Sequence, residues 1–185
     1  MYFKIILTTL PLITLIILYI VESSINYKAK KIRDQAISYT APITILIMSA
    51  STFELWLTGS YISIINFLVV IGLLLIILGF ALRIAVHLFW LKIIKLHNVR
   101  NEKLELITDG LYKSIRNPMW SSTLLLLLGF TFFSHSISSF LVLIFFWLQL
   151  IAKQLKLEEE HLFKIYGDKF KKYLQKSWRL IPFLY

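Results

Sequence analysis

The sequence predicts an all-α integral membrane protein with about five transmembrane helices. Hydrophobic residues make up 58% of the 185 residues, and the mean hydropathy of +0.74 is too high for a soluble domain of ordinary composition. Several apolar runs approach or exceed the roughly 20 residues that a helix needs to cross a bilayer. The basic residues gather in alternate loops, which is typical of cytoplasmic loops in membrane proteins.

Five apolar segments are candidate spans. They are Tyr2 to Val21, Ile37 to Leu57, Tyr61 to Leu82, Met119 to Phe133 and Ser139 to Lys156. The fourth is short, so we expect it to form a hairpin with the fifth. Apolar character persists beyond the third span as far as Ile94, which predicts that this helix continues into the cytoplasm. Gly72 and Gly79 lie on one face of it and allow close helix contact.

The placement of charge supports this topology independently of the apolar runs. Basic residues occupy the first loop, the third loop and the segment after the last span, whereas the second and fourth loops contain none. Of the 20 Lys and Arg residues, only Lys4 lies on the other side. This predicts an outer N-terminus and a cytoplasmic C-terminus, in a bacterial inner membrane or, in a eukaryote, the endoplasmic reticulum.

Composition also narrows the possible partners and chemistries. The formal net charge of +10 is explained by orientation and by attraction to anionic lipid headgroups, so we expect membrane lipids and no nucleic acid as partners. The chain has no cysteine, which excludes disulfides, thiolate metal sites and cysteine nucleophiles. Its four histidines show no metal-ligand spacing, and no metal site is predicted.

The first polar motif lies between the third and fourth predicted spans, from Asp109 to Trp120. Gly110 can adopt a turn conformation, and Pro118 is suited to the first position of the next helix. Between them lie Tyr112, Arg116 and Asn117. A helix N-terminus next to an arginine suits a carboxylate or another anion. Alternatively, the segment is a juxtamembrane loop whose basic residues only set the topology.

The second polar motif follows the fifth predicted span. Glu158, Glu159 and Glu160 form an acidic run on an otherwise basic face, and this is unfavourable unless cations or hydrogen-bond donors meet it. The apolar residues after Lys156 follow a helical period, which suits a helix that leaves the membrane and lies on its surface. A solvated helix face is the alternative explanation of the glutamates.

Together the two motifs resemble the signatures of the integral membrane methyltransferases that include isoprenylcysteine carboxyl methyltransferases and phospholipid N-methyltransferases. The first signature has the form Leu-x-Thr-x-Gly-x-Tyr-x-x-x-Arg-His-Pro-x-Tyr, and its named positions other than the histidine and the last tyrosine are matched here by Leu106, Thr108, Gly110, Tyr112, Arg116 and Pro118. The second signature is a Glu-Glu pair, a leucine a few residues on, a Gly-x-x-(aromatic)-x-x-Tyr run and a late Arg-x-Ile-Pro run. It is matched here by Glu158, Glu159, Leu162, Gly167, Phe170, Tyr173 and the run from Arg179 to Pro182. Asn117 stands where many members have histidine, and Trp120 replaces a tyrosine.

The resemblance covers roughly Gly79 to the end of the chain. It implies a single membrane methyltransferase domain over residues 1–185, with N-terminal membrane helices in residues 1–78 and a catalytic half in residues 79–185. It further implies S-adenosylmethionine as methyl donor, in a cytoplasm-facing pocket formed by the C-terminal helical hairpin and tail. The expected cofactor-binding residues are Gly110, Tyr112, Arg116, Asn117, Pro118, Glu158 and Glu159, of which Arg116, Glu158 and Glu159 are also the expected catalytic residues.

The acceptor is left open between two lipophilic classes. A carboxylate such as that of a prenylated cysteine needs no base, whereas the amine of phosphatidylethanolamine must first lose a proton. Since neither motif shows an evident base, carboxyl O-methylation is favoured slightly over phospholipid N-methylation. A non-catalytic membrane protein, such as a transporter subunit or an assembly factor, is the alternative outside the enzymes. The sequence does not predict an oligomeric state.

Overall fold

The computed structural model describes residues 43–54, 57, 67–100 and 106–182 of the chain. The first predicted span, Tyr2 to Val21, lies outside the described residues, as do the beginnings of the second and third. Regular structure in the described ranges is helical, apart from an isolated parallel β-bridge between Ile115 and Trp178. The prediction of an all-α fold is therefore confirmed for this part of the chain.

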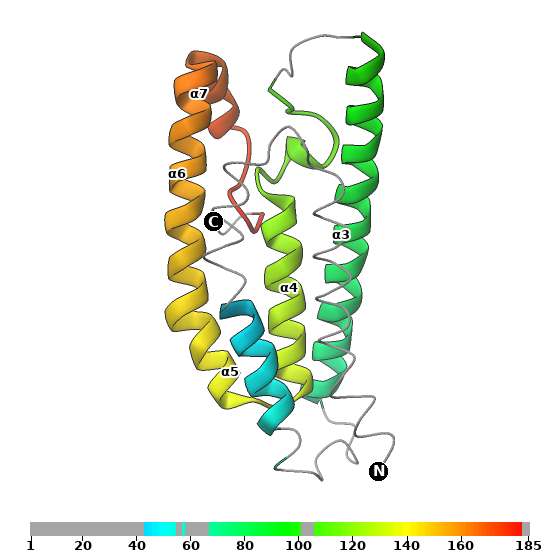
Figure 1. Cartoon of the computed structure of the whole chain (residues 1–185), viewed down its shortest axis with the longest axis vertical. Coiled ribbons are helices and arrows are strands. Elements are labelled where there is room, and N and C mark those ends of the chain that lie inside the picture. Colours follow the sequence, from blue (N-terminus) through cyan, green and yellow to red (C-terminus); the bar gives the residue numbers. More distant parts are fainter. Residues whose placement is uncertain (1–42, 55–56, 58–66, 101–105, 183–185) are drawn as a thin grey trace. The chain divides into compact units, whose positions relative to one another are not determined.

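The helices follow one another in the order shown in Figure 1. A helix over Ile43–Glu54 comes first among the described residues. It is followed by α3 (Phe67–Arg100), the 3-10 helix η2 (Gly110–Lys113), α4 (Pro118–Phe133), α5 (Ile137–Val142), the π-helix η3 (Leu143–Trp147), α6 (Leu148–Tyr166) and α7 (Asp168–Leu174). The predicted continuation of the third helix as far as Ile94 is confirmed, because α3 extends 34 residues to Arg100; that this extension lies in the cytoplasm remains a prediction.

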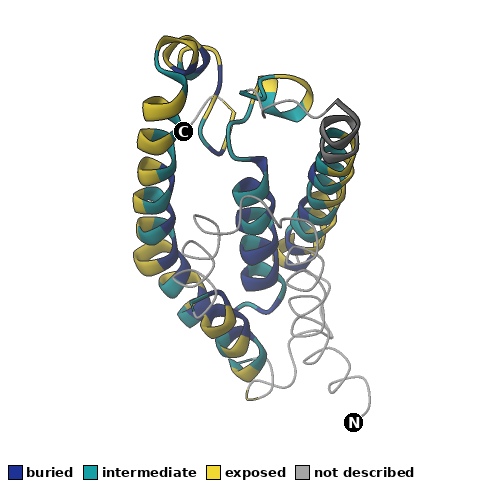
Figure 2. Cartoon of the chain, turned by 45° about the horizontal axis from the view of Figure 1, so that its top comes forward, coloured by how far each residue is buried: buried dark blue, intermediate teal, exposed yellow. Residues whose placement is uncertain are grey.

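Two helical stretches are long and apolar enough to cross a membrane. They are Phe67–Ile93, with 27 residues, and Ile137–Tyr166, with 30 residues, which joins α5, η3 and α6. Ile43–Glu54 and Pro118–Phe133 are shorter apolar helices. Many large apolar residues of α3 and of the stretch from α5 to α6 are exposed, as on a lipid-facing surface, and Figure 2 colours the exposed residues of these helices yellow. The complete five-span topology remains a prediction.

Contacts divide the chain into two compact units, the first of which comprises Met1–Ile76 and Leu127–Leu155. Within it α3 and α4 approach closely at a glycine pair, since a Cβ on Gly72 would lie 2.8 Å from the carbonyl oxygen of Gly129. Ser139 donates to the Ile47 carbonyl at 3.0 Å, and the Trp147 indole donates to Thr44 at 3.2 Å. Small and hydroxyl-bearing residues thus join these helices, as is common in membrane bundles.

The second unit comprises Ile77–Leu126 and Lys156–Tyr185 and contains both polar motifs. Here Gly79 lies against Leu126, which confirms a close helix contact at both glycines of α3. Arg83, which the charge pattern grouped with the third loop, lies inside α3, in the predicted continuation of this helix to Ile94. Its Nη1 donates to the Met119 carbonyl and to the hydroxyls of Ser122 and Thr123, at 2.9 to 3.1 Å, so this charge ties α3 to the first turns of α4.

The acidic run lies on α6, which continues without a break to Tyr166. The chain turns only at Gly167, whose positive φ of 52° is readily adopted by glycine, and α7 follows. The helix predicted after Lys156 is thus the continuation of α6, and its position on the membrane surface remains a prediction. In α7, Phe170 and Tyr173 are buried, and this anchors the helix to the second unit.

Candidate functional site

The site is built on the loop that leads into α4. Gly110 has a positive φ of 59°, and a Cβ at this position would lie 2.7 Å from the Phe89 ring, so the turn requires glycine for both conformation and space. The Tyr112 amide donates to the Asp109 carbonyl at 3.1 Å within η2. Pro118 is the first residue of α4, as predicted, because its missing N–H costs nothing at a helix start.

Tyr112 is held from two sides by aromatic residues. Its hydroxyl accepts from the Trp90 indole N–H at 2.7 Å, and the two rings meet edge-on with centroids 6.2 Å apart. The Tyr173 hydroxyl donates to the Tyr112 backbone carbonyl at 2.6 Å. Burial raises the pKa of Tyr112 to about 12, and the nearby charges of Tyr173 and Glu158 act in the same direction. Glu158 is therefore within electrostatic reach of this aromatic cluster.

The segment after α7 folds back along the same loop, and we call residues 177–181 the C-terminal strap. Its Trp178 pairs with the loop as a short parallel bridge, in which the Arg116 amide donates to the Trp178 carbonyl at 2.7 Å and the Trp178 amide donates to the Ser114 carbonyl at 2.8 Å. The Asn117 side chain donates to the Arg179 carbonyl at 3.1 Å, and Ser121 donates to the Leu180 carbonyl at 2.5 Å. The loop and the strap thus form one hydrogen-bonded layer.

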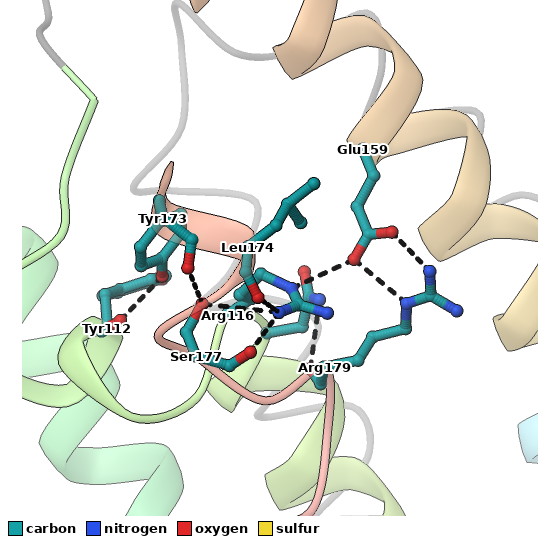
Figure 3. Close-up of polar contacts among 8 residues, drawn as sticks. Tyr112, Arg116, Glu159, Tyr173, Leu174, Ser177 and Arg179 are labelled. Carbon is teal, nitrogen blue, oxygen red and sulfur yellow. Dashed lines mark hydrogen bonds and ion pairs between the residues drawn. The ribbon is translucent and has the colours of Figure 1, made fainter. Parts of the chain in front are cut away.

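Arg116 joins three segments of the second unit (Figure 3). Its Nε donates to Glu159 Oε1 on α6 at 3.1 Å. Its Nη1 donates to the Leu174 carbonyl at the end of α7 at 3.1 Å, and also to the carbonyl and hydroxyl oxygens of Ser177. The guanidinium therefore acts as a fork that fixes the strap and α6 relative to the loop.

Glu159 receives a second arginine from the strap (Figure 3). Arg179 donates through Nε to Oε1 at 3.0 Å and through Nη2 to Oε2 at 2.5 Å, which is a bidentate pair. The side chains of Arg116 and Glu159 are each 13% exposed, and that of Arg179 is 24% exposed, so solvent screens these ion pairs only partly. Two guanidiniums share one carboxylate, which leaves the trio with a net positive charge.

The structure brings several sequence-predicted residues together. Arg116 contacts Glu159 directly, Asn117 contacts the strap, and Gly110 and Pro118 shape the loop that carries Tyr112. Four further residues were not among the predicted site residues, namely Arg83, Trp90, Ser177 and Arg179. Arg179 has a sequence signal, since it opens the late Arg-x-Ile-Pro run; the other three occur at positions that no local pattern distinguishes.

These features are those of a helical protein with two stretches long and apolar enough to cross a membrane and a compact polar cluster at the loop between α3 and α4. Residues 67–169, more than half of the chain, match the family model described as phospholipid methyltransferase, and the chain belongs to this family. The family implies methyltransferase activity in general. No curated protein and no solved structure matches the chain.

Proposed function

We propose that this protein is an S-adenosylmethionine-dependent methyltransferase that acts on a lipid-tailed acceptor at the cytoplasmic face of the membrane. The observation that carries the proposal is the convergence of both predicted motifs on one site, through the contact between Arg116 of the first and Glu159 of the second. These residues lie 43 positions apart, with a helical hairpin between them. If the two motifs were unrelated juxtamembrane segments, there would be no reason for Arg116 and Glu159 to be in contact.

The residues of the site fit S-adenosylmethionine by their chemistry. Glu158 and Glu159 are acceptors suited to an ammonium group or to ribose hydroxyls, Tyr112 supplies an aromatic face for adenine, and Arg116, Asn117 and the start of α4 suit a carboxylate. When bound, this cofactor supplies an electrophilic methyl group on a sulfonium. The role of the chain is then to align the acceptor with that group and to exclude water.

The proposed acceptor is a carboxylate of the isoprenylcysteine type. Such an acceptor arrives ionised, so the chain has only to orient it, and neither motif need supply a base. The lipid tail would lie along exposed apolar faces such as that of α3, where Leu74, Ile77 and Leu78 are all more than half exposed. The reactive head would thereby meet the polar site while the tail remains in the membrane.

The second candidate is N-methylation of phosphatidylethanolamine. The observation in its favour is the family match, whose description is phospholipid methyltransferase. This reaction needs an additional step at the site, because an ammonium headgroup must lose a proton before its nitrogen can act as nucleophile. Glu158 or Glu159 would stabilise the positive charge of the amine in this case.

Binding of S-adenosylmethionine to the purified full chain in nanodiscs tests the proposal. Arg116→Ala and Glu159→Ala should each abolish measurable binding, because either change removes a charged hydrogen bond that holds loop, strap and α6 together. Glu160→Gln, next in the sequence and exposed, is the matched control and should bind like the wild type. Unaltered binding in both alanine variants would contradict the site, and no binding by the wild type would favour a non-catalytic membrane protein.

A further inference from the structure

α7 has one buried side and one basic side. Its Phe170 and Tyr173 are buried, as is Ser177 shortly after the helix. Four lysines of the same segment are exposed, and we call them the lysine cluster: Lys169, Lys171, Lys172 and Lys176. Asp168 is the one acidic residue between positions 168 and 176, so four lysines and one aspartate give this surface a formal charge of +3. The two sides of α7 therefore meet very different surroundings.

The buried side of α7 is bonded to the candidate site (Figure 3). The Tyr173 hydroxyl donates to the Tyr112 carbonyl at 2.6 Å. Arg116 donates to the Leu174 carbonyl at 3.1 Å and to the carbonyl of Ser177. Since these acceptors are backbone atoms of α7 and of the residues that follow it, Arg116 keeps them only while α7 holds its position. A contact that fixes the outer side of α7 would therefore also act on Arg116.

The C-terminal strap places this segment beside the start of α4. Ser121, in the second turn of α4, donates to the Leu180 carbonyl at 2.5 Å. The fourth predicted span begins at Met119, so Leu180 lies next to the point at which the chain is predicted to enter the membrane. Because the strap follows α7 directly, the lysine cluster is only a few residues away from this predicted boundary.

Two large apolar side chains of the strap are exposed directly after the lysine cluster. Trp178 is 40% exposed and Ile181 is 39% exposed, although the buried Leu180 lies between them. Tryptophan is enriched at the boundary between membrane and water, and lysine can lay its apolar stem along a surface while its ammonium group reaches the headgroups. Basic residues combined with exposed apolar ones are typical of segments that lie at a membrane interface.

Anionic phospholipids fit this surface better than a soluble acidic partner does. Their headgroups supply the negative charge that complements the lysine cluster, and the apolar layer beneath them accommodates Trp178 and Ile181. A soluble acidic protein would complement the lysines alone and would leave the two apolar side chains in water. The predicted cytoplasmic side is also the side on which membranes carry a negative surface potential. The combination therefore indicates a lipid surface as the partner.

We propose that the lysine cluster and the exposed strap residues Trp178 and Ile181 form a docking surface for anionic phospholipid headgroups. Occupation of this surface holds α7 in the position in which it meets Arg116, so ligand binding at the site is tighter in an anionic membrane. The docking itself is independent of any ligand at the site, whereas its effect on the site rests on the proposed function.

The experiment uses the absence of cysteine from the chain. Gln175→Cys, at an exposed position of the same segment, carries a nitroxide spin label in the full chain. The protein is placed in nanodiscs of phosphatidylcholine, alone or mixed with phosphatidylglycerol. One readout is the accessibility of the label to a water-soluble paramagnetic reagent. The other is the affinity for S-adenosylhomocysteine, which has no net charge at neutral pH and is not concentrated by the anionic surface.

Two variants with the same change of charge are compared in this labelled protein. The first replaces three lysines of the cluster by glutamine, at Lys169, Lys171 and Lys172. The matched control replaces three exposed lysines of α6, at Lys153, Lys156 and Lys164. High salt is applied to the unsubstituted labelled protein as well, because it screens the same charges without any change of sequence.

Phosphatidylglycerol should lower the accessibility of the label about threefold or more and tighten binding of S-adenosylhomocysteine by a similar factor. Both effects should disappear in the α7 variant and in high salt, and both should persist in the α6 control. Equal accessibility in the two lipids would overturn the docking surface and would favour a soluble acidic partner. Equal losses in the α6 control would show a general effect of charge and would overturn the assignment to α7.

The two readouts separate this inference from the proposed function. If the label responds to phosphatidylglycerol but the affinity does not, the effect of α7 on the site is overturned while the docking surface stands. If the unsubstituted protein binds no S-adenosylhomocysteine in either lipid, the proposed function fails, and the accessibility of the label alone decides whether α7 docks on anionic lipid.

Discussion

Single side chains at the site work largely as donors to backbone carbonyls of the C-terminal strap. Asn117 donates to Arg179, Ser121 to Leu180, and Arg116 to Ser177. These partners lie about 60 residues away in the sequence, so the residue types of the first motif were recognisable from the sequence while their partners were not. The first motif requires hydrogen-bond donors at these positions. Substitutions that keep a donor should therefore be tolerated better than those that remove it.

Asn117 offers a matched test of that requirement. Asn117→Asp keeps the shape but removes the amide donor and places a carboxylate oxygen against the Arg179 carbonyl, so the free energy of unfolding should fall by about 1–3 kcal/mol. Asn117→His retains an N–H donor and should lose less. Denaturant unfolding in detergent, together with S-adenosylmethionine affinity, measures both effects. Equal stability of the two variants would show that the donor is unimportant.

The raised pKa of Tyr112 predicts that the stability of the protein depends on pH in the alkaline range. Its pKa is raised by burial from 10.0 to about 12, so the folded protein holds this proton more tightly than the unfolded chain. The resulting stabilisation is complete below pH 10 and is lost as the pH rises through 12. The wild type should therefore lose roughly 2 kcal/mol more than Tyr112→Phe over this range. Parallel pH profiles for the two proteins would contradict the buried environment of the phenol.

At the scale of the helices, local rules predicted the starts and turns, but they did not predict the side-chain contacts between helices. Pro118 opens α4 and Gly110 turns the loop as the sequence indicates. The charge pattern grouped Arg83 with the third loop, while the apolar run predicted a helix that continues past it to Ile94. In the structure α3 does continue through this position, and α4 supplies three acceptors for its guanidinium, which the sequence did not predict. The composition of one segment does not reveal acceptors on another.

The contact between Arg83 and α4 is expected to stabilise the second unit. Arg83→Leu removes bonds to the Met119 carbonyl and to Ser122, whose hydroxyl keeps its own bond to Met119 at 2.7 Å. No buried charge is left unpaired, so the loss should be moderate, about 1–3 kcal/mol. Lys92→Leu, at an exposed position of the same helix, should change stability by less than about 0.5 kcal/mol. Thermal unfolding in nanodiscs compares the two.

Gly72 and Gly167 are required for different reasons, the first because there is no space for a side chain and the second because of its backbone conformation. A Cβ on Gly72 would lie 2.6 Å from the Phe133 amide nitrogen, and this backbone atom cannot move aside alone, so Gly72→Ala should force α3 and α4 apart. We expect a loss of about 1–3 kcal/mol or more. Gly167→Ala meets nothing within 4 Å and should lose about 1–3 kcal/mol through its backbone alone, because its φ of 52° and ψ of −125° lie in a region that only glycine adopts readily. Thermal unfolding of Gly72→Ala at the temperature of the wild type would contradict the close helix contact.

At the scale of the whole molecule, the absence of cysteine makes the predicted topology directly measurable. Ile137→Cys, at a position 73% exposed, should react with a membrane-impermeant maleimide in intact cells, because the fourth loop is predicted to lie outside. Lys176→Cys, before the strap, should react only after the membrane is opened. Labelling of both in intact cells would exclude the predicted orientation of the site towards the cytoplasm.

The most direct test of the account is transfer of a labelled methyl group from S-adenosylmethionine by the purified protein, offered a prenylated cysteine analogue and phosphatidylethanolamine side by side. Carboxyl O-methylation predicts base-labile label on the cysteine analogue, and the loss of this label in Glu159→Gln. Base-stable label on the phospholipid alone would establish N-methylation instead. Label on neither acceptor, with no cofactor bound, would contradict the assignment of this polar site as a methyltransferase centre.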